Sequence, residues 1–517
     1  MRRAALVLLC ASAQLDIQVD DATVVYHGGA NYTAARAFCD TYRIPNGRAC
    51  AYDVVRTSGA TPGQLVELAW GTLPDAYKDA RDADAVVQEL ARRVATLQSF
   101  SLDDLSVPVV QPHWRLAFSG GSGADIAAIL KGWGALYRDA LFHAMVEPRV
   151  HVKPRVGFVS SWFCNSAIGR LYAGLIEKLD KAKFEVYVFH VREPSGRLKR
   201  DFFTDAIDAS SRAKVLPRDL DAARHEIAAA ALDIVVFTDI GMETFTYALA
   251  FARMAPIQCV FWGHPTTSGV PSESVDYYLV MDTAEGLSGS ERYSEQLVRL
   301  DTLGAYYYSN ESGQYDSTKS REMYAAESAY LPSSGHLYAA PQHCLKFHPL
   351  FDEALVRILT RDADAILVVK DCSTTITLQE RLAKRVDIKG RIVKVPQLSL
   401  QDYVRLFGGS HVALETFPFG GSITSLDSFE GGTPVVSLAQ LSGRPALTVA
   451  LYDIMGVSGC VASSINEYVE TAVRIASNAT LRASIRARLD AARSSLYESM
   501  AAVREIEAFF IRALKLS

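Results

Sequence analysis

FPFGGSITSLDSFEGGTPVV, residues 417–436, has the pattern of a tight turn, a short helix and a buried strand in succession. Gly420 and Gly421 lack a Cβ, so the backbone can turn sharply there and approach a ligand closely. The helix that follows presents unsatisfied N–H groups and partial positive charge at its N-terminus, which suits a diphosphate without a metal ion. The stretch therefore predicts a nucleotide-diphosphate site.

Polar side chains of the same stretch complete this predicted site. Asp427 lies one turn into the expected helix, where its carboxylate can accept a hydrogen bond from a ribose hydroxyl. The hydroxyl groups expected beside the phosphates belong to Ser422, Thr424 and Ser425. The alternative is a purely structural turn, because Gly and Ser are ordinary turn and helix-capping residues.

Two series of alternating strands and helices follow one another along the chain, and each predicts a domain. The first covers residues 151–325 and the second covers residues 326–480. Such alternation predicts parallel sheets covered by helices, so we expect an α/β fold of two Rossmann-like domains facing a cleft. This arrangement, called GT-B, occurs in glycosyltransferases and in some epimerases and phosphorylases. The cleft is the expected ligand site.

The segments outside these domains are predicted to be an extension and a closing helix. Residues 14–150 form the N-terminal extension, a small α+β module followed by helices, to which the sequence assigns no role. Residues 481–517 are expected to form a C-terminal helix long enough to pack back across the first domain.

Residues 1–13 have two arginines, a short apolar run and a small-residue ending, a pattern typical of a signal peptide. The alternative is the first β-strand of a cytosolic domain. A true signal peptide would place the protein in the secretory pathway, and a strand would leave it in the cytoplasm, so the localisation stays open. No other apolar run reaches the roughly 18 residues that a spanning helix needs.

The net charge of −5 over 517 residues, without a basic stripe, argues against a nucleic-acid partner. The eight cysteines include no C-x-x-C pair and no histidine stands at metal spacing, which argues against a zinc site. Cys39 and Cys50 are close enough in sequence for a disulfide if the chain is secreted. Cys259 and Cys372 lie in or beside strand-like runs and are expected to be small core residues.

Four segments, taken in order, carry a resemblance to a known family. They are RVGFVSSWFCNSAIGRL (155–171), LDIVVFTDIGMETFTYALAFARMAPIQCVFWGHPTTSG (232–269), YAAPQHCLKFHP (338–349) and FPFGGSITSLDSFEGGTPVV (417–436). They resemble the catalytic region of the O-linked N-acetylglucosamine transferase (SPINDLY-like) family, over residues 150 to 515. The tetratricopeptide repeats usual upstream in that family are not visible.

The resemblance implies an inverting glycosyltransferase that moves N-acetylglucosamine from UDP-N-acetylglucosamine to Ser or Thr hydroxyls of a protein acceptor. It implies neither a metal ion nor any other cofactor. The residues agree in part with the absence of a metal ion. A metal-dependent transferase would need an Asp-x-Asp motif after an apolar strand, but Asp362-Ala-Asp364 precedes a strand. A helix-ending turn is expected there instead.

The resemblance also implies roles for individual residues outside the glycine-rich stretch. Lys346 matches the lysine that holds the diphosphate, and Gln342 precedes it with three intervening residues where the animal enzyme has two. Tyr403 takes the place of the aromatic residue or histidine that stacks on the nucleobase. His264 and Thr267 match the loop that borders the sugar. The structural alternatives are a surface lysine, a core tyrosine and a loop histidine.

One position departs from the family pattern. Where many relatives carry a histidine after the first strand, this chain has Ser166, which cannot act as a base near neutral pH. Acid–base assistance would then come from Asp239 or from water. This departure favours one alternative, a catalytically weakened nucleotide-sugar-binding protein. A second alternative is a transferase of the same fold that uses GDP-fucose or UDP-glucose.

Overall fold

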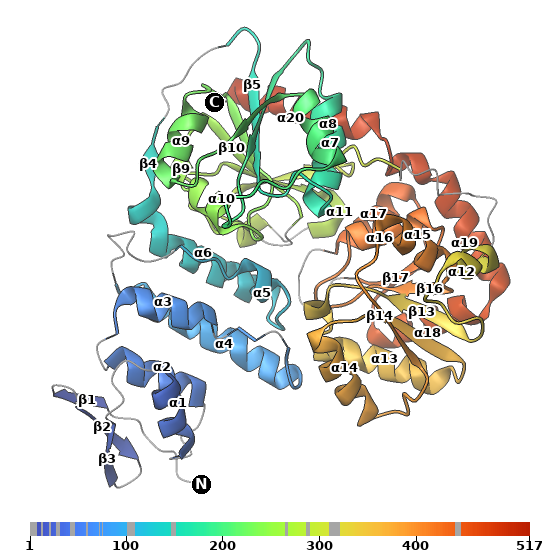
Figure 1. Ribbon diagram of the computed structural model, residues 1–517, viewed down its shortest axis with the longest axis horizontal. Coiled ribbons are helices and arrows are strands. Elements are labelled where there is room, and N and C mark those ends of the chain that lie inside the picture. Colours follow the sequence, from blue (N-terminus) through green and yellow to red (C-terminus); the bar gives the residue numbers. More distant parts are fainter. Residues whose placement is uncertain are drawn as a thin grey trace.

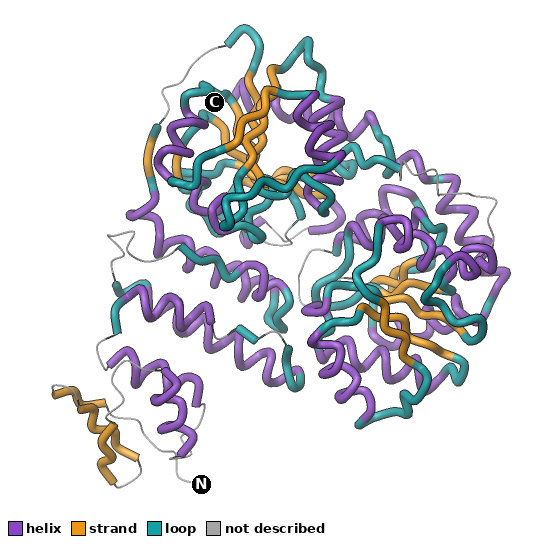
Figure 2. The backbone as a smooth tube through the Cα atoms, viewed as in Figure 1, coloured by secondary structure: helices purple, strands orange, loops and turns teal. Residues whose placement is uncertain are grey.

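Two parallel sheets, each flanked by helices, make up the body of the molecule (Figures 1 and 2). The computed structural model describes residues 8–11, 14–19, 22–26, 32–41, 47–57, 60–71, 73–74, 76–100, 109–145, 151–263, 267–285, 290–309, 321–439 and 446–516. The predicted α/β class and GT-B arrangement of two facing Rossmann-like domains are confirmed.

The first domain is built on a sheet whose seven described strands are all parallel, in the order β12-β11-β10-β8-β5-β6-β7. Its strands are β5 (Arg155–Ser160), β6 (Glu185–His190), β7 (Arg212–Val215), β8 (Ile234–Phe237), β10 (Ile257–Phe261), β11 (Tyr277–Met281) and β12 (Gln296–Leu300). Its helices are α7 (Ala167–Lys178), α8 (Phe202–Ala209), α9 (Leu220–Ala228), α10 (Thr244–Leu249), α11 (Asp282–Glu285) and the 3₁₀ turn η1 (Ser290–Arg292). The strands β5, β8 and β10 are almost wholly buried, as their continuous apolar runs predict.

The second domain has a six-stranded parallel sheet in the order β15-β14-β13-β16-β17-β18. Its strands are β13 (His336–Ala340), β14 (Ala365–Lys370), β15 (Ile392–Val395), β16 (Val412–Leu414), β17 (Val435–Leu438) and β18 (Val461–Ala462). Its helices are α12 (Arg321–Glu327), η2 (Cys344–Lys346), α13 (Pro349–Arg361), α14 (Ser373–Ala383), α15 (Leu400–Gly409), α16 (Ile423–Glu430), α17 (Leu447–Met455) and α18 (Ile465–Ser477).

Each sheet has a point at which the chain reverses its direction of winding. In the first sheet this point lies between the neighbours β5 and β8, and in the second it lies between β13 and β16. Ligands of open α/β sheets bind beyond the carboxyl ends of the strands at such a point. The loops after these four strands are therefore where a site is expected.

The N-terminal extension begins with a small antiparallel sheet of β1 (Leu8–Ala11), β2 (Gln14–Val19) and β3 (Ala22–Tyr26). Helices follow at α1 (Tyr32–Thr41), α2 (Gly47–Thr57), α3 (Pro62–Gly71), α4 (Ala80–Leu97), α5 (His113–Ala117) and α6 (Gly123–Leu141). Residues 8–11 thus form a strand, and the signal-peptide hypothesis for residues 1–13 stays a prediction. A short pairing of β4 (His143–Ala144) with β9 (Ala252–Arg253) joins the extension to the first domain.

The predicted single C-terminal helix is wrong, because two helices occupy this segment. They are α19 (Ala479–Ala491) and α20 (Met500–Leu516), with the 3₁₀ turn η4 (Arg493–Ser495) between them. The break lies where the chain passes from one domain to the other: the Tyr497 hydroxyl donates to Leu426 O at 2.5 Å, and Glu498 N donates to Tyr307 O at 2.9 Å.

The expected packing of this segment across the first domain is confirmed for α20. Phe510 packs against Phe184, and Asp180 N donates to Glu507 at 2.8 Å. Figure 1 shows α20 beside the first sheet and α19 beside the second. Within the described residues, no helix is both long and apolar enough to cross a membrane.

Candidate functional site

The structure places most of the predicted site residues at the two winding-reversal points. Gln342 and Lys346 follow β13, and the Gly420–Gly421 turn follows β16. In the first domain, Ser166 follows β5 and Asp239 follows β8. Four loops that are far apart in the sequence therefore carry the candidate residues at the carboxyl ends of their strands.

Lys346 is the centre of the second-domain group. Its ammonium Nζ donates to Gln342 Oε1 at 3.0 Å and to Gly420 O at 2.7 Å, and lies 4.9 Å from the centre of the Phe419 ring. Burial lowers the pKa of Lys346 to about 8, against an opposing effect of the Glu415 carboxylate. An ammonium has three N–H donors, and the two described acceptors leave one for a ligand.

Gln342 and Thr424 extend this group to the start of α16. The Thr424 hydroxyl donates to Gln342 Oε1 at 3.1 Å, so this one amide oxygen accepts hydrogen bonds from both Lys346 and Thr424. Gln342 is buried, whereas Thr424 and Lys346 are half-buried. The three-residue spacing between Gln342 and Lys346 therefore still brings the two side chains together.

Glu415, at the end of β16, holds the glycine turn in place. Its Oε1 accepts from Gly421 N at 2.7 Å and from the Thr448 hydroxyl at 2.5 Å. A Cβ added at Gly420 would lie only 2.4 Å from Glu415 Oε1, and one at Gly421 would lie 2.5 Å from Ser425 Oγ. The turn therefore requires glycine because the chain passes so close to these side chains.

Glu415 is a residue that sequence reasoning missed. The signal was present, since a carboxylate ends the apolar run of residues 412–414 that the sequence predicts to be a buried strand. Burial raises the pKa of Glu415, and hydrogen bonds from Ser437, Thr448 and Gly421 oppose this shift.

The N-terminus of α16 is open. Ser422 is the residue before the helix, and no side-chain hydrogen bond caps the helix there. Its backbone ψ of −77° is not the extended value of an ordinary N-cap, so its hydroxyl does not fold back over the amides. Ser425 N donates to Ser422 O at 3.1 Å, so among the first-turn amides those of Ile423 and Thr424 remain available for an anion.

Ser425 does not fit its predicted role beside the phosphates. Its hydroxyl is 2.7 Å from that of Thr448, and its side chain is buried in the domain. The helical turn that points Thr424 toward Gln342 points Ser425 inward, which explains the difference. Ser425 thus stabilises α17 against α16.

Asp427 forms an ion pair across the two domains. Its carboxylate accepts hydrogen bonds from both terminal nitrogens of Arg170. The distance from Nη1 to Oδ2 is 3.3 Å. Both side chains are largely buried, and Arg170 also lies over the Tyr307 ring at 5.0 Å. A carboxylate offers about four lone-pair positions, so a ribose hydroxyl can still donate to Asp427 beside Arg170.

A cavity of about 170 Å³ lies beside this ion pair, and residues of both domains line it. Four aromatic rings and one aliphatic side chain form its apolar walls, and the remaining lining groups are polar. The lining residues are Arg170, Phe202, Phe203, Tyr307, Tyr308, Ser309, Leu400, Asp427 and Glu430.

Tyr403 lies one turn after Leu400 on α15, the helix that supplies one wall of the cavity. Burial raises the pKa of the Tyr403 hydroxyl to about 12, and the nearby Asp427 charge adds to the shift. Its ring is half-buried and stacks on Phe407 with centres 6.4 Å apart. The structure thus places Tyr403 near the cavity, and its stacking on a nucleobase stays a prediction.

In the first domain, Ser166 is the N-cap of α7. Its hydroxyl donates to Trp162 O at 2.7 Å and accepts from Gly169 N at 3.2 Å. Both contacts belong to the loop and its helix. The structure therefore explains this serine by helix capping and gives no support to a catalytic role.

Asp239 is almost completely buried at the end of β8. Its Oδ2 accepts from the Ser160 hydroxyl at 2.9 Å and from Ser161 N at 2.8 Å, whereas Oδ1 makes no hydrogen bond of ordinary geometry among the described residues. Burial raises the pKa of Asp239 to about 7, although the Thr246 hydroxyl is close enough to lower this pKa slightly. A carboxyl group with this pKa can exchange a proton near neutral pH.

The predicted sugar-bordering loop is described only in part. His264 lies outside the described residues. Thr267 is buried, and its hydroxyl donates to Glu295 at 2.7 Å while it accepts from Ser294 N at 3.0 Å. Thr267 therefore stabilises the loop through buried hydrogen bonds. These contacts do not support a direct contact between its hydroxyl and a sugar.

The Asp362-Ala-Asp364 turn is confirmed as a helix end, because Asp362 caps the C-terminus of α13. Among the described residues, Asp362, Asp364 and His336 come close enough to share a metal ion. His336 begins β13, whereas Lys346 follows the end of that strand. This group therefore lies at the amino ends of the strands, whereas the candidate site lies at their carboxyl ends.

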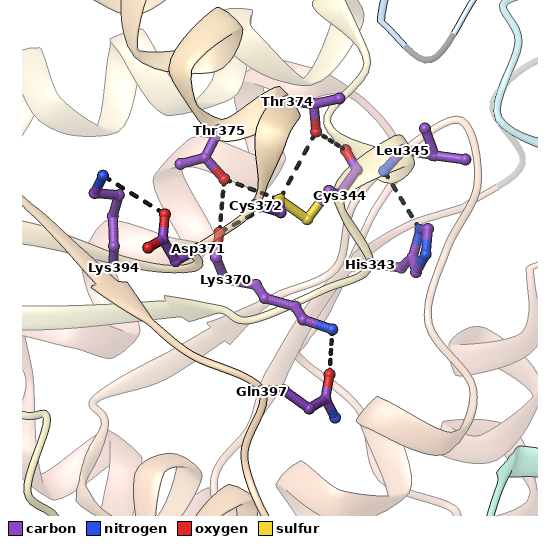
Figure 3. The surroundings of a disulfide bond; sticks show 10 residues. All are labelled: His343, Cys344, Leu345, Lys370, Asp371, Cys372, Thr374, Thr375, Lys394 and Gln397. Atoms are coloured by element: carbon purple, nitrogen blue, oxygen red, sulfur yellow. Dashed lines mark hydrogen bonds and ion pairs between the residues drawn. A yellow bond between two sulfur atoms is a disulfide. The ribbon is translucent and has the colours of Figure 1, made fainter.

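The cysteine predictions have a mixed outcome. Cys39 and Cys50 form a disulfide that joins α1 to α2, and Cys259 is a buried core residue as expected. The assignment of Cys372 as a small core residue is wrong, because it is half-buried and bonded to Cys344 (Figure 3). The partner begins the η2 turn, 28 residues away in sequence, and sequence spacing gives no sign of the pairing.

A family model described as glycosyl transferase family 41 matches residues 92–307 and 308–506. The curated relatives include proteins named "Probable UDP-N-acetylglucosamine--peptide N-acetylglucosaminyltransferase SPINDLY". That of Petunia hybrida is 26% identical over 250 residues, and that of Arabidopsis thaliana is 28% identical over 249 residues. Each match covers 46% of this chain and 25% of the relative, so the chain spans about a quarter of their length.

Among solved structures, a mutant of the O-GlcNAc transferase of Thermobaculum terrenum superposes with a TM-score of 0.67 at 20% identity. The superposition covers 94% of this chain and 88% of that one. At this level of identity, the likeness shows a shared fold.

Proposed function

The chain belongs to glycosyl transferase family 41, and we propose that it transfers N-acetylglucosamine from UDP-N-acetylglucosamine to Ser or Thr hydroxyls of a protein acceptor. We further propose that transfer inverts the anomeric carbon and needs no metal ion. The names of the SPINDLY relatives support this donor and a peptide acceptor.

One observation carries the proposal: Lys346, Gln342 and Thr424 meet at the open N-terminus of α16. When the sugar leaves, negative charge grows on the β-phosphate of the nucleotide. The Lys346 ammonium and the amides of Ile423 and Thr424 at the start of α16 are positioned to stabilise that charge, which is the task of a metal ion in other transferases. This positive charge supports the proposal that transfer needs no metal ion.

The interdomain cavity supports a nucleotide as the carrier of the sugar. Its aromatic walls, among them Phe202, Phe203 and Tyr308, offer flat apolar surface for a nucleobase. Asp427 lines the same cavity and can accept from a ribose hydroxyl. In this arrangement, the nucleoside lies between the domains and the diphosphate lies at α16.

Asp239 is the candidate acid–base group. Its pKa of about 7 suits proton transfer at neutral pH, and its Oδ1 makes no hydrogen bond of ordinary geometry among the described residues. Because the carboxyl group is buried, we propose that it takes the acceptor proton through a bound water. Ser166 then serves the fold of this loop and takes no part in proton transfer.

A second candidate function rests on Ser166. If the family histidine is indispensable, a chain with a capping serine there binds a nucleotide sugar without transferring it. The donor alternatives, UDP-glucose and GDP-fucose, share the diphosphate contacts and differ only in the base and the sugar.

The test is the substitution Lys346→Ala in the full chain. We expect UDP affinity, measured by calorimetry, to fall by about 100-fold or more, because charge-assisted hydrogen bonds to the diphosphate are lost. Transfer of labelled sugar to a peptide mixture should be abolished. Lys389→Ala is the matched control, since that exposed lysine is on a surface turn of the same domain and should leave both measurements unchanged.

The same assays separate the alternatives. Binding of UDP and UDP-N-acetylglucosamine without transfer in the wild-type protein would favour the binding-protein alternative. Stronger binding of UDP-glucose or GDP-fucose would replace the proposed donor. Loss of transfer on addition of a chelator, with recovery on addition of Mn²⁺, would overturn the proposal of metal independence.

A further inference from the structure

We propose that the Cys344–Cys372 disulfide is a reversible redox-modification site that controls donor affinity through the position of Lys346. The inference rests on the proposed function, because it concerns the lysine assigned to the diphosphate. It adds a chemical partner, a dithiol reductant, that the transfer reaction does not require.

The disulfide holds the turn that carries Lys346. Cys344 is the first residue and Lys346 the last residue of η2, a single 3₁₀ turn. Cys372 stands directly before α14, with its Cα 6.4 Å from that of Cys344. Figure 3 shows the bond joining Cys344 of the η2 turn to Cys372, which lies in the short connection between β14 and α14. The position of η2, and with it the start of the Lys346 side chain, is therefore set in part by this bond.

Two further contacts connect α14 to the same turn. The Thr374 hydroxyl donates to Cys344 O at 3.2 Å, and Arg381 donates to Phe347 O at 2.8 Å. These contacts do not depend on the redox state of the cysteines. Reduction is therefore expected to loosen the η2 turn without releasing it, and to weaken donor binding by a moderate factor.

Exposure separates this disulfide from the other described cysteines. Cys344 and Cys372 are half-buried, whereas Cys39 and Cys50 are 0% and 3% exposed. The free thiols of Cys164, Cys259 and Cys460 are all buried. A reductant in solution therefore reaches the bond beside Lys346 more easily than it reaches Cys39, Cys50, Cys164, Cys259 or Cys460.

The local chemistry favours reduction through Cys344. A thiolate of the reductant attacks Cys344 Sγ, and Cys372 leaves as a thiolate at the N-terminus of α14, where the helix stabilises negative charge. The second thiol of the reductant then displaces Cys344 from the mixed disulfide. Two electrons pass to the protein, the reductant leaves as its disulfide, and two protons from its thiols end on the two cysteines.

The surroundings can accommodate the reduced form. The Thr375 hydroxyl oxygen lies 3.0 Å and Lys370 O lies 3.7 Å from Cys372 Sγ. In the disulfide this sulfur carries no proton, so neither oxygen receives a hydrogen bond from it. After reduction, the new S–H group can donate to either of them.

The experiment compares UDP affinity in the oxidised and the reduced full chain. Dithiothreitol is the probe, and alkylation with mass spectrometry identifies the cysteines that have been reduced. We expect reduction of Cys344 and Cys372 to weaken UDP binding by about 3- to 10-fold, because a binding residue loses preorganisation, and reoxidation to restore it. Cys372→Ser should show the weakened affinity without reductant and no further response to it.

Cys460→Ser is the matched control, because it removes a buried free thiol of the same domain and should respond to dithiothreitol like the wild type. Equal UDP affinity in both redox states, with reduction of this pair verified, would overturn the inference and leave the proposed function intact. Absence of the bond from protein purified without reductant would also overturn it. Failure of folded wild-type protein to bind UDP in either state would instead remove the proposed function, and the inference with it.

Discussion

The helices α7 and α16 both begin beside the winding-reversal point of their sheets, yet their N-termini differ. Each follows a strand at the winding-reversal point of its sheet, β5 for α7 and β16 for α16, and each is preceded by a serine. Ser166 has an extended backbone and accepts from Gly169 N, so the end of α7 is closed. Ser422 makes no such bond, so the end of α16 is open.

The difference shows that a serine before a helix does not by itself indicate either a cap or a ligand site. In the second domain, Glu415 binds Gly421 N and shapes the turn so that Ser422 leaves the helix end uncovered. In the first domain, the serine hydroxyl contacts its own helix and loop. The proposed anion site therefore lies in the second domain, and Arg170 of the first domain reaches Asp427 across the interface.

The largest effect that would sharpen this comparison is expected for Gly420→Ala. The new Cβ would meet Glu415 Oε1 at 2.4 Å, which forces the turn away from its position over Lys346. We expect UDP affinity to fall by about 100-fold and stability to fall by about 1 to 3 kcal/mol, the usual cost of overpacking. Calorimetry and urea denaturation measure the two effects.

Gly71→Ala is the control for this substitution, because a Cβ at Gly71 would meet nothing within 4 Å. It should leave UDP affinity unchanged and should not lower stability, because alanine is favoured over glycine at this helical position. Normal UDP binding by Gly420→Ala would show that the glycine turn is not part of the anion site, and the contrast between the two helix ends would then lose its functional meaning.

A second prediction concerns the pH dependence of donor binding. Burial lowers the pKa of Lys346 to about 8 in the free protein, so the ammonium is charged below this pH and loses its proton above it. A diphosphate binds the charged form, and UDP affinity should therefore fall by about tenfold per pH unit above pH 8. Calorimetry from pH 7 to pH 9.5 provides the measurement.

Lys346→Arg tests the assignment of this titration, because a guanidinium stays charged throughout that range. Its UDP affinity should be weaker at pH 7 but nearly independent of pH up to 9.5. The same alkaline decline in wild type and in the arginine variant would assign the titration to another group.

The smallest effects are expected for the two serines before the helices. Ser166→Ala removes a working N-cap and should lower stability by about 1 kcal/mol while UDP affinity stays the same. Ser422→Ala removes no cap, so its stability should change by less than about 0.5 kcal/mol, while UDP affinity falls if the hydroxyl meets a phosphate. A larger loss of stability in Ser422→Ala than in Ser166→Ala would contradict the comparison.

Sequence patterns predicted the fold class well because strand and helix periodicities are local. The apolar runs around residues 155–160 and 234–237 became buried parallel strands, and the Gly-Gly-Ser turn came before a helix as expected. The prediction of one C-terminal helix was wrong, because the break at residues 492–499 is stabilised by hydrogen bonds to Tyr307 and Leu426, which lie in other parts of the chain.

For the candidate site, the sequence by itself determined which loops to expect there. Glycine and helix-start residues indicated the turn after β16, and the family resemblance indicated the lysine turn after β13. Only the tertiary structure decided which side chains meet there. Arg170 and Asp427 are 257 residues apart, and Cys344 and Cys372 are 28 apart. Such pairs come together through the packing of whole domains and neighbouring strands, and a local pattern carries no information about the partner.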